Sequence, residues 1–363
     1  MFDNESSIRI NLLRFPLTVG VLFHHSYETS VRFSYGTVGV SQNTFISEFV
    51  RNLISQGLCR MAPPLFFLLS GYLFFAGFKW SEDGYLSKLK RRVRTLLIPL
   101  LFWNIASLSI FVLAQTIPAT QIYVSFKLYP PIKCFDTYVF LSAIFGIGIN
   151  RFPIAYQFWF IRDLMILCIL SPAVHFINKK IFPIFFTCIF FCWFLNICPN
   201  YSESVGAILF FCLGAFLSQK NKSLFAWDRY GHFALLLYFP ILLLDAAFYG
   251  DPFTFYLHKI GIFLGVLAAL YITKNIAEKG NLRATVLGLS GASFFVFAAH
   301  EPLLTICRKL VYRAIAPDCS ALVLALYFAI PILVIFILLG THRLLLYIAP
   351  EFLKLITGGR HSV

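Results

Sequence analysis

An arginine and a histidine share one face of the first apolar stretch of this chain, residues 8–27, which reads IRINLLRFPLTVGVLFHHSY. About 20 such residues suffice to cross a bilayer as a helix. Arg14 and His25 are eleven positions apart, which on a helix is three turns plus about 20°, or about 16.5 Å along the axis. A guanidinium holds anions, and an imidazole exchanges protons near neutral pH. Because charge inside a span is costly and usually functional, we expect this stripe to line a path through the membrane.

A second interpretation of the same residues stays open. Arg14 can reach the lipid headgroups from a helix end, and the two histidines can be interfacial residues without chemistry. His24 points about 100° away from His25 on a helix, so we assign His24 a packing or interfacial role.

The composition of the chain indicates a polytopic membrane protein. Of its 363 residues 59% are hydrophobic and 13% are charged, whereas soluble proteins have about 25% charged residues. We predict an all-α transmembrane helix bundle and a single domain over residues 1–363, without an added soluble domain. The net charge of +14 lies in short loops beside apolar runs, so we interpret it as a topology signal and expect no nucleic-acid partner. The nine cysteines predict neither disulfides nor a metal site.

We predict about ten spans from ten apolar segments, of which 204–218 is short for a span: 8–27, 61–78, 95–115, 156–177, 181–198, 204–218, 231–249, 256–276, 284–308 and 321–347. Residues 28–60 are expected to form a polar loop, and 138–149 is an apolar piece too short to cross. Alternate loops are rich in Lys and Arg, whereas loops 199–203 and 250–255 contain neither. This asymmetry places both termini in the cytoplasm.

With this topology, polar residues from two distant segments reach the outer half of the membrane beside His25, so that three segments contribute to one depth. They are Arg162, Asp163, His300 and Glu301. Two imidazoles, carboxylates and a guanidinium at one depth are the strongest sign of a site in this sequence. The alternative is that Arg162 and Asp163 hold the helix bundle together by pairing, and that His300 is interfacial.

Two arginines form a second layer toward the cytoplasm. Arg91 and Arg94 are three positions apart and therefore lie on one helical face. We place them where the third span begins, and a helix N-terminus favours anions through its unbonded N–H groups and its dipole. A phosphate-bearing ligand suits such a pair. The alternative is a positive-inside anchor only.

These segments resemble the acyltransferase-3 integral membrane proteins, which O-acylate surface polysaccharides and related molecules. The resemblance rests on five motifs in the expected order: Arg14-x10-His25 followed by Ser26, PLFFLLSGYLFF, Arg91-x-x-Arg94, FWFIRDLMILCILSP and FAAHEPLL. Glu301 departs from the apolar or aromatic residue often found after that histidine. The resemblance implies a multi-pass protein of the bacterial cytoplasmic (inner) membrane.

By the same resemblance, the donor is a cytoplasmic acyl-CoA, usually acetyl-CoA, and no cofactor is bound permanently. His25 would be the catalytic histidine and Arg14 its essential partner, while Arg91 and Arg94, with Arg14, would bind the donor. Acyl transfer needs a base for the acceptor hydroxyl, which suits an imidazole. We add Asp163 and His300 as catalytic candidates, and Arg162 and Glu301 as oxyanion or acceptor contacts.

Two functions from different classes remain in view. The first is an O-acyltransferase, by default an O-acetyltransferase, working by direct transfer or through an acyl-histidine. Its acceptor would be a glycan or a lipid-linked glycan, and the motifs distinguish neither the sugar nor the oligomeric state. The second is a transporter or flippase of a lipid-linked glycan or an anion, which would use the same charges as a translocation path.

Overall fold

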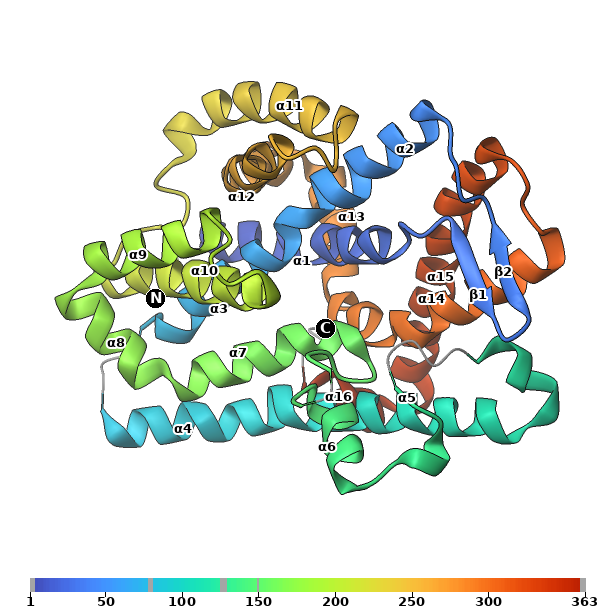
Figure 1. The fold of residues 1–363 in the computed structure, drawn as a ribbon. Helices are drawn as coiled ribbons and strands as arrows, with labels where there is room; N and C mark the ends of the chain where they lie inside the picture. The colour runs from blue at the N-terminus through green and yellow to red at the C-terminus, as the bar shows by residue number, and fades with distance from the viewer. Residues whose placement is uncertain (1–3, 78–80, 125–128, 149, 360–363) are drawn as a thin grey trace. The chain divides into compact units, whose positions relative to one another are not determined.

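Helices make up almost all of the computed structural model, which describes residues 4–77, 81–124, 129–148 and 150–359 (Figure 1). Within these ranges the strands are β1 (Ser30–Phe33) and β2 (Gly36–Gly39), which form an antiparallel hairpin with Val31 opposite Val38. Apart from this hairpin, the all-α prediction is confirmed.

Six helical runs in the described part of the chain are long and apolar enough to cross a membrane: Phe45–Phe75, Glu82–Thr116, Pro199–Gln219, Asp228–Ala247, Thr254–Glu278 and Ser320–Ile348. Two bent pairs raise the number to eight if each is one span: Tyr156–Ile169 with Ser171–Lys180, bent by 64°, and Gly280–Ser290 with Ser293–Ile315, bent by 60°. The protein is therefore a multi-pass membrane protein. The count of ten spans and the cytoplasmic termini stay predictions.

The predicted segments agree with the helices to different degrees. The short segment 204–218 lies within α10 (Ser202–Gln219), part of one of the six runs. The first predicted segment, 8–27, forms α1 (Asn4–His25), which is not among the six helical runs that are long and apolar enough to cross a membrane. Segment 181–198 forms α9 (Phe182–Phe194), whose 13 residues are shorter than a span. The predicted ends at Phe78 and Ile149 lie outside the described residues.

The predicted polar loop 28–60 was wrong over its second half. A helical run begins at Phe45 and continues through α2 (Phe45–Arg51), the π-helix η1 (Asn52–Gly57) and the 3-10 helix η2 (Leu58–Met61) into α3 (Ala62–Phe75). Two of its buried polar side chains find distant backbone partners: Arg51 Nη1 donates to the carbonyl of Tyr27 at 2.8 Å, and Asn52 Nδ2 to that of Ala246 at 3.2 Å. Local polarity does not reveal such partners.

The helices form two compact units, each assembled from three stretches of chain. The first unit comprises Met1–His24, Asn52–Arg92 and Asp163–Gly291, and the second comprises His25–Arg51, Val93–Arg162 and Ala292–Val363. The first unit holds most of α1 and α7 together with η1, η2, α3, α9 and α10. Its other helices are α4 (Glu82–Arg92), α8 (Ser171–Lys180), η7 (Pro199–Tyr201), η8 (Asp228–Tyr230), α11 (Gly231–Ala247), α12 (Thr254–Glu278) and α13 (Gly280–Ser290); α7 spans Trp159–Ile169.

Helices α3 and α10 pack closely in the first unit because two glycines face backbone. A Cβ at Gly71 would lie 2.1 Å from the carbonyl oxygen of Phe211, and one at Gly214 would lie 2.0 Å from that of Leu68. Small residues allow such an approach between membrane helices.

Arg9 anchors the start of α1 in the first unit. Its side chain is buried and forms a bidentate ion pair with Asp228, with Nη1–Oδ2 and Nη2–Oδ1 distances of 2.6 and 3.0 Å. Nε donates to Thr273 Oγ1 at 2.9 Å, and Nη2 also donates to the carbonyl of Leu270. A buried cation needs this complete set of partners. Sequence reasoning had not singled out Arg9.

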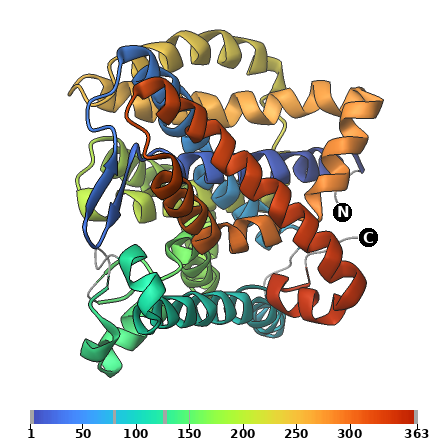
Figure 2. The ribbon, with the colours of Figure 1, turned by 90° about the vertical axis from the view of Figure 1, so that its right-hand side faces the viewer.

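The second unit is built around α5 (Ile98–Thr116), α14 (Ser293–Ile315) and α15 (Ser320–Ile348). Helix α15 runs beside α14 and leads into α16 (Pro350–Thr357), which packs on α5 (Figure 2). Trp103 of α5 joins α5 to α16, because its Nε1 donates to the carbonyl of Ile356 at 3.0 Å. The remaining elements are the hairpin, α2, η3 (Val93–Leu97), η4 (Pro118–Tyr123), η5 (Ile132–Cys134), α6 (Thr137–Phe145) and η6 (Tyr156–Phe158).

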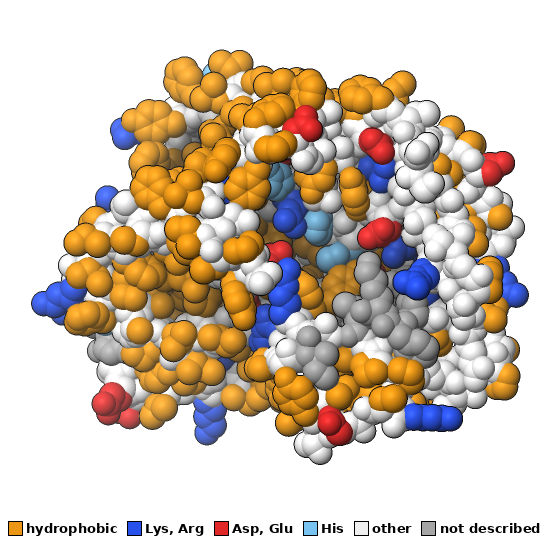
Figure 3. Space-filling model, in the orientation of Figure 1, with side chains coloured by type: hydrophobic (Ala, Val, Ile, Leu, Met, Phe, Trp, Pro, Cys, Tyr) orange, Lys and Arg blue, Asp and Glu red, His pale blue; other side chains and the backbone are white. Residues whose placement is uncertain are grey.

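Apolar side chains cover much of the surface shown in Figure 3, including α9 and α11. Phe233 and Phe239 on α11 are more than 60% exposed, as is Ile184 on α9. Exposed apolar surface of this kind marks a membrane-facing protein.

Candidate active site

Helix α14 is broken at Glu301, where φ is −108° and ψ is 135°, and Pro302 follows. Proline has no N–H, so the carbonyl of Ala298, four residues earlier, loses its helical donor. Gln157 replaces that donor: its Nε2 donates to the carbonyls of Ala298 at 3.1 Å and Glu301 at 3.2 Å. The side chain of Gln157 thereby joins η6 to the break in α14.

The segment before η6 is held in turn by α5. Asn104 of α5 is fully buried, and its Nδ2 donates to the carbonyl of Leu100 at 2.8 Å. Its Oδ1 accepts the backbone N–H of Ala155 at 3.0 Å. Both ends of the amide therefore have partners, as a buried amide requires. Helices α5, η6 and α14 form one connected frame.

Three rings meet in this frame. His25, the last residue of α1, stacks on His300 with ring centroids 5.5 Å apart and planes at 17°. It also meets Tyr156 edge-on, with centroids 4.8 Å apart and planes at 78°. The structure thus brings together the two histidines that the sequence placed at one depth. Tyr156 is an addition that sequence reasoning missed.

His300 has a defined proton position. It is completely buried, and its Nδ1 lies 2.6 Å from the carbonyl oxygen of Phe297. A carbonyl can only accept, so Nδ1 carries the proton and Nε2 holds the lone pair. Nε2 has no hydrogen-bond partner in the described part of the chain. Nε2 can therefore accept a hydrogen bond from a substrate.

Glu301 is buried and uses both carboxylate oxygens within the protein. Oε1 accepts from Tyr156 Oη at 2.9 Å, and Oε2 accepts from the backbone N–H of Thr305 at 3.3 Å. Contacts therefore run from Glu301 through Tyr156 to His25. The predicted neighbourhood of His25, His300 and Glu301 is present, although the part of Glu301 in acceptor binding stays a prediction.

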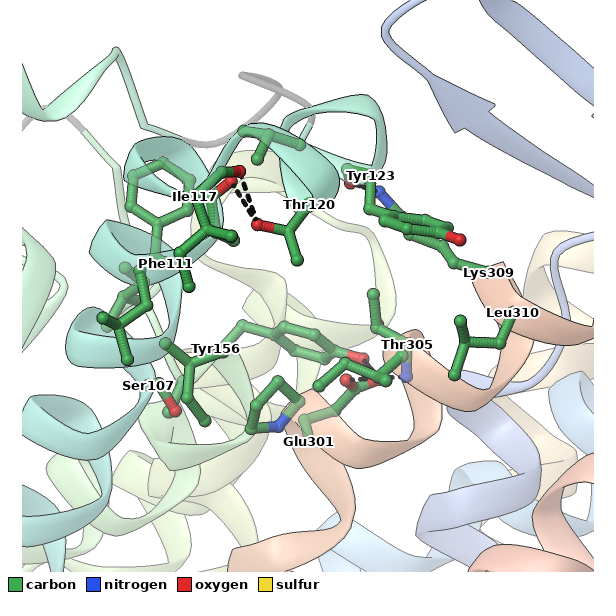
Figure 4. Close-up of a pocket in the computed structure, with 18 residues that line it drawn as sticks. Ser107, Phe111, Ile117, Thr120, Tyr123, Tyr156, Glu301, Thr305, Lys309 and Leu310 are labelled. Carbon is green, nitrogen blue, oxygen red and sulfur yellow. Dashed lines mark hydrogen bonds between the residues drawn. The ribbon is translucent and has the colours of Figure 1, made fainter. Parts of the chain in front are cut away.

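A cavity of about 480 Å³ adjoins Tyr156 and Glu301 (Figure 4). Its size is typical of small-molecule sites. Residues of α5, η4, the stretch before η6 and α14 line it, and most are apolar. In Figure 4, Tyr156 and Glu301 form one side of the cavity, Ile117 and Thr120 face them, and Lys309 and Tyr123 lie together at one end.

Arg162 and Asp163 are both engaged in hydrogen bonds. Arg162 Nη1 donates to the carbonyls of Gly146 at 2.7 Å and Arg151 at 2.6 Å, which ties α7 to the connection after α6. Asp163 belongs to the first unit, where its Oδ2 accepts from Ser204 Oγ at 2.7 Å. These bonds agree with the alternative that both residues hold the helix bundle together. Their catalytic roles stay predictions.

The family profile described as an acyltransferase domain, acyltransferase family 3, matches residues 7–341. The chain belongs to acyltransferase family 3. It is similar to the succinoglycan biosynthesis protein ExoH of Rhizobium meliloti (strain 1021), with 27% identity over 366 residues, which cover 99% of this chain and 94% of that protein. No solved structure matches. The resemblance found from the five motifs is confirmed, and so is the prediction of an enzyme.

The arginines predicted to bind the donor of this acyltransferase are exposed. Arg14 lies in α1, Arg91 in α4, and Arg94 in the π-helix η3. One supporting argument was wrong: the helical run that holds both arginines begins at Glu82, so the pair does not lie at the N-terminus of its own run. Amides inside a helix are already bonded, so a donor would be held by the side chains. Arg94 lies in a π-helical turn, a feature frequent at functional sites.

Sequence reasoning missed a second carboxylate–imidazole pair in the acyltransferase. In the first unit, His258 Nδ1 of α12 lies 2.8 Å from Asp245 Oδ2 of α11, and Asp245 is buried. Oδ1 of Asp245 has no partner among the described residues. The sequence signal was an aspartate inside the apolar run ILLLDAA. Tyr156 and Gln157 gave no comparable signal. The described residues contain no group of three His, Cys, Asp or Glu placed to hold a metal.

Proposed function

We propose that this acyltransferase moves an acyl group, by default acetyl, from cytoplasmic acyl-CoA to a hydroxyl of a cell-surface polysaccharide or its lipid-linked precursor. The observation that carries the proposal is the stacked His25–His300 pair, which contacts the cavity-lining Tyr156 through His25, in a chain of this family. The polysaccharide acceptor is supported by the name of the similar protein, which refers to succinoglycan biosynthesis. We place the enzyme in the bacterial inner membrane as a single acyltransferase-3 domain of about ten spans with cytoplasmic termini.

In the proposed reaction, His25 takes the proton of the acceptor hydroxyl while the oxygen attacks the thioester carbonyl. The carbon–sulfur bond then breaks, the proton passes to the departing thiolate, and the products are an ester and CoA. The alternative is that His25 first carries the acyl group. Two imidazolium ions stacked this closely would repel each other, so the His25–His300 pair holds one extra proton at most.

The other predicted residues have supporting roles. Arg91 and Arg94, with Arg14, hold the donor phosphates, and the roughly 16.5 Å from Arg14 to His25 along a helix suits a pantetheine arm. Asp163 orients an imidazole as in catalytic triads. Arg162 stabilises the oxyanion, for which it must use N–H groups other than those on Nη1, because Nη1 is already engaged by carbonyls. Acyl-CoA is a substrate, and no permanent cofactor is invoked.

The test is transfer of label from radiolabelled acetyl-CoA by purified protein. We expect His25→Ala to bind the donor without turnover, and Arg91→Ala/Arg94→Ala to lose donor binding. His24→Gln is the matched control, because His24 is held by Ser55 and Arg60 and an amide can replace both bonds. If His25→Ala keeps normal transfer, the proposal is wrong. Wild type that neither binds nor uses any acyl-CoA would instead favour transport.

A further inference from the structure

The cavity beside Tyr156 opens along an apolar surface. Three residues that line it, Leu113, Ile117 and Leu310, are 55%, 46% and 50% exposed. They come from α5, the start of η4 and α14, so the opening lies between helices of one unit. Leu113 lies on a helical run, and Leu310 on a bent helix pair, that is apolar enough to cross a membrane, and aliphatic side chains exposed on such helices suit contact with hydrocarbon. The cavity is therefore accessible from the lipid side.

The walls offer few hydrogen bonds to a sugar. The hydroxyl of Thr120 donates to the carbonyls of Ala114 and Ile117, and both oxygens of Glu301 have partners. Ser107 offers one hydroxyl without a partner among the described residues. Most hydroxyls of a sugar in this space would lose water without a replacement, which costs free energy. The lining instead suits hydrocarbon, and a cavity of about 480 Å³ admits one chain more readily than the two chains of a phospholipid.

One cation, Lys309, lines the cavity at the end where Figure 4 shows it with Tyr123, and a second cation, Arg313, contacts the same tyrosine. Lys309 Nζ donates to the carbonyl of Tyr123, and Arg313 Nη1 donates to Tyr123 Oη at 2.9 Å. The two cations are four residues apart on α14 and so share a face. Neither has a carboxylate partner in the part of the chain that the structure describes. They can bind an anion that follows the hydrocarbon chain.

We propose that this cavity binds the anchor of a lipid-linked acceptor, a polyprenyl phosphate, with its chain between α5 and α14 and its phosphate at Lys309 and Arg313. The inference rests on the proposed function and narrows it to the lipid-linked precursor. In the predicted topology, α14 runs outward, and Lys309 lies about 12 Å beyond Glu301 along a helix. The phosphate then sits at headgroup level and the chain lies deeper, as in a lipid of the outer leaflet.

The experiment is photolabelling of the full chain in nanodiscs with a polyprenyl phosphate that carries a diazirine on its chain. We expect the label in residues 107–124 and 302–310. Unlabelled polyprenyl phosphate should displace it, whereas the same amount of phosphatidylglycerol should not. Ala114→Trp, which fills the cavity, and Lys309→Met/Arg313→Met should each lower labelling about tenfold. Ala321→Trp and Arg343→Met, at exposed positions of α15, are the matched controls and should label as wild type does.

Any of three results would overturn the inference. They are equal displacement by phosphatidylglycerol, labelling outside these segments, and unchanged labelling in both test variants. Since labelling needs no turnover, it separates this site from the proposed function. If the protein is labelled but does not use acyl-CoA, the lipid site is supported and the proposed reaction is wrong. If the protein transfers the acyl group but the cavity is not labelled, the proposed reaction is supported and the lipid site is wrong. Gel filtration of each variant shows whether it has folded.

Discussion

The imidazole of His300 has one defined tautomer because its Nδ1 faces the carbonyl oxygen of Phe297 at 2.6 Å. The lone pair on Nε2 is therefore permanently available, next to the ring of His25. An imidazole fixed in this way acts as an acceptor without first losing a proton. The role we give His300 is to take a hydrogen bond or a proton during transfer.

We expect His300→Ala to lower kcat about 100-fold, the usual contribution of a positioned acid–base group, and to leave acetyl-CoA binding unchanged. Label transfer and calorimetric titration with acetyl-CoA measure the two effects. His342→Ala is the control, because His342 is another buried imidazole, packed on Phe295 with ring centroids 5.6 Å apart. Wild-type kcat in His300→Ala would remove His300 from the mechanism.

The Asp245–His258 pair makes a prediction about stability. His258→Leu leaves the buried Asp245 without its partner, so we expect a loss of about 3 kcal/mol in the free energy of unfolding. Adding Asp245→Leu removes the stranded carboxylate and should recover much of that loss. Denaturant unfolding in detergent measures both. Strictly additive effects of the two substitutions would show that the residues are not coupled.

At the scale of single elements, helix α14 combines a break with a complete set of substitute bonds. Pro302 removes a donor, and Gln157 supplies it from another segment, which Asn104 in turn fixes through Ala155. Sequence reasoning predicted a span here from its hydropathy. It could not predict the break's partners, because Gln157 and Asn104 lie far from α14 in the chain and carry no spacing signal.

The α3–α10 crossing gives a prediction at the same scale. Gly71→Ala and Gly214→Ala each place a methyl group within about 2 Å of a backbone carbonyl oxygen, so the helices must separate. We expect each to destabilise the protein by about 1–3 kcal/mol, measured by thermal unfolding in detergent. Gly340→Ala on α15 is the control, because a Cβ there meets nothing within 4 Å. It should be neutral or stabilise by about 0.5 kcal/mol. Equal stability of all three variants would contradict the close packing.

At the scale of the whole molecule, local hydropathy predicted where most helices lie, since lipid exposure selects apolar residues over a whole span. It failed over residues 45–60, where two buried polar side chains donate to distant carbonyls. The depth argument brought His25 and His300 together correctly. The contacts of Tyr156 with His25 and with Glu301 depend on tertiary packing, which no local pattern reports.

The topology of the molecule can be tested with reporters. We expect a green fluorescent protein fused to the C-terminus to fluoresce, because the terminus is predicted to be cytoplasmic. Alkaline phosphatase inserted after Asp251 should be active, because loop 250–255 has no Lys or Arg and is predicted to lie outside. The same phosphatase inserted after Lys222 is the control and should be inactive. The opposite pattern would invert the proposed reaction across the membrane.

The exposed walls of the cavity, at Leu113, Ile117 and Leu310, have a kinetic consequence. An occupant that enters from the side arrives by two-dimensional diffusion within the leaflet. The quantity that saturates the enzyme is then the mole fraction of acceptor among the lipids, rather than its concentration in the assay volume. For the proposed lipid-linked acceptor, diluting the vesicles at a fixed acyl-CoA concentration would leave turnover per enzyme unchanged, whereas adding plain lipid to the same vesicles would slow it.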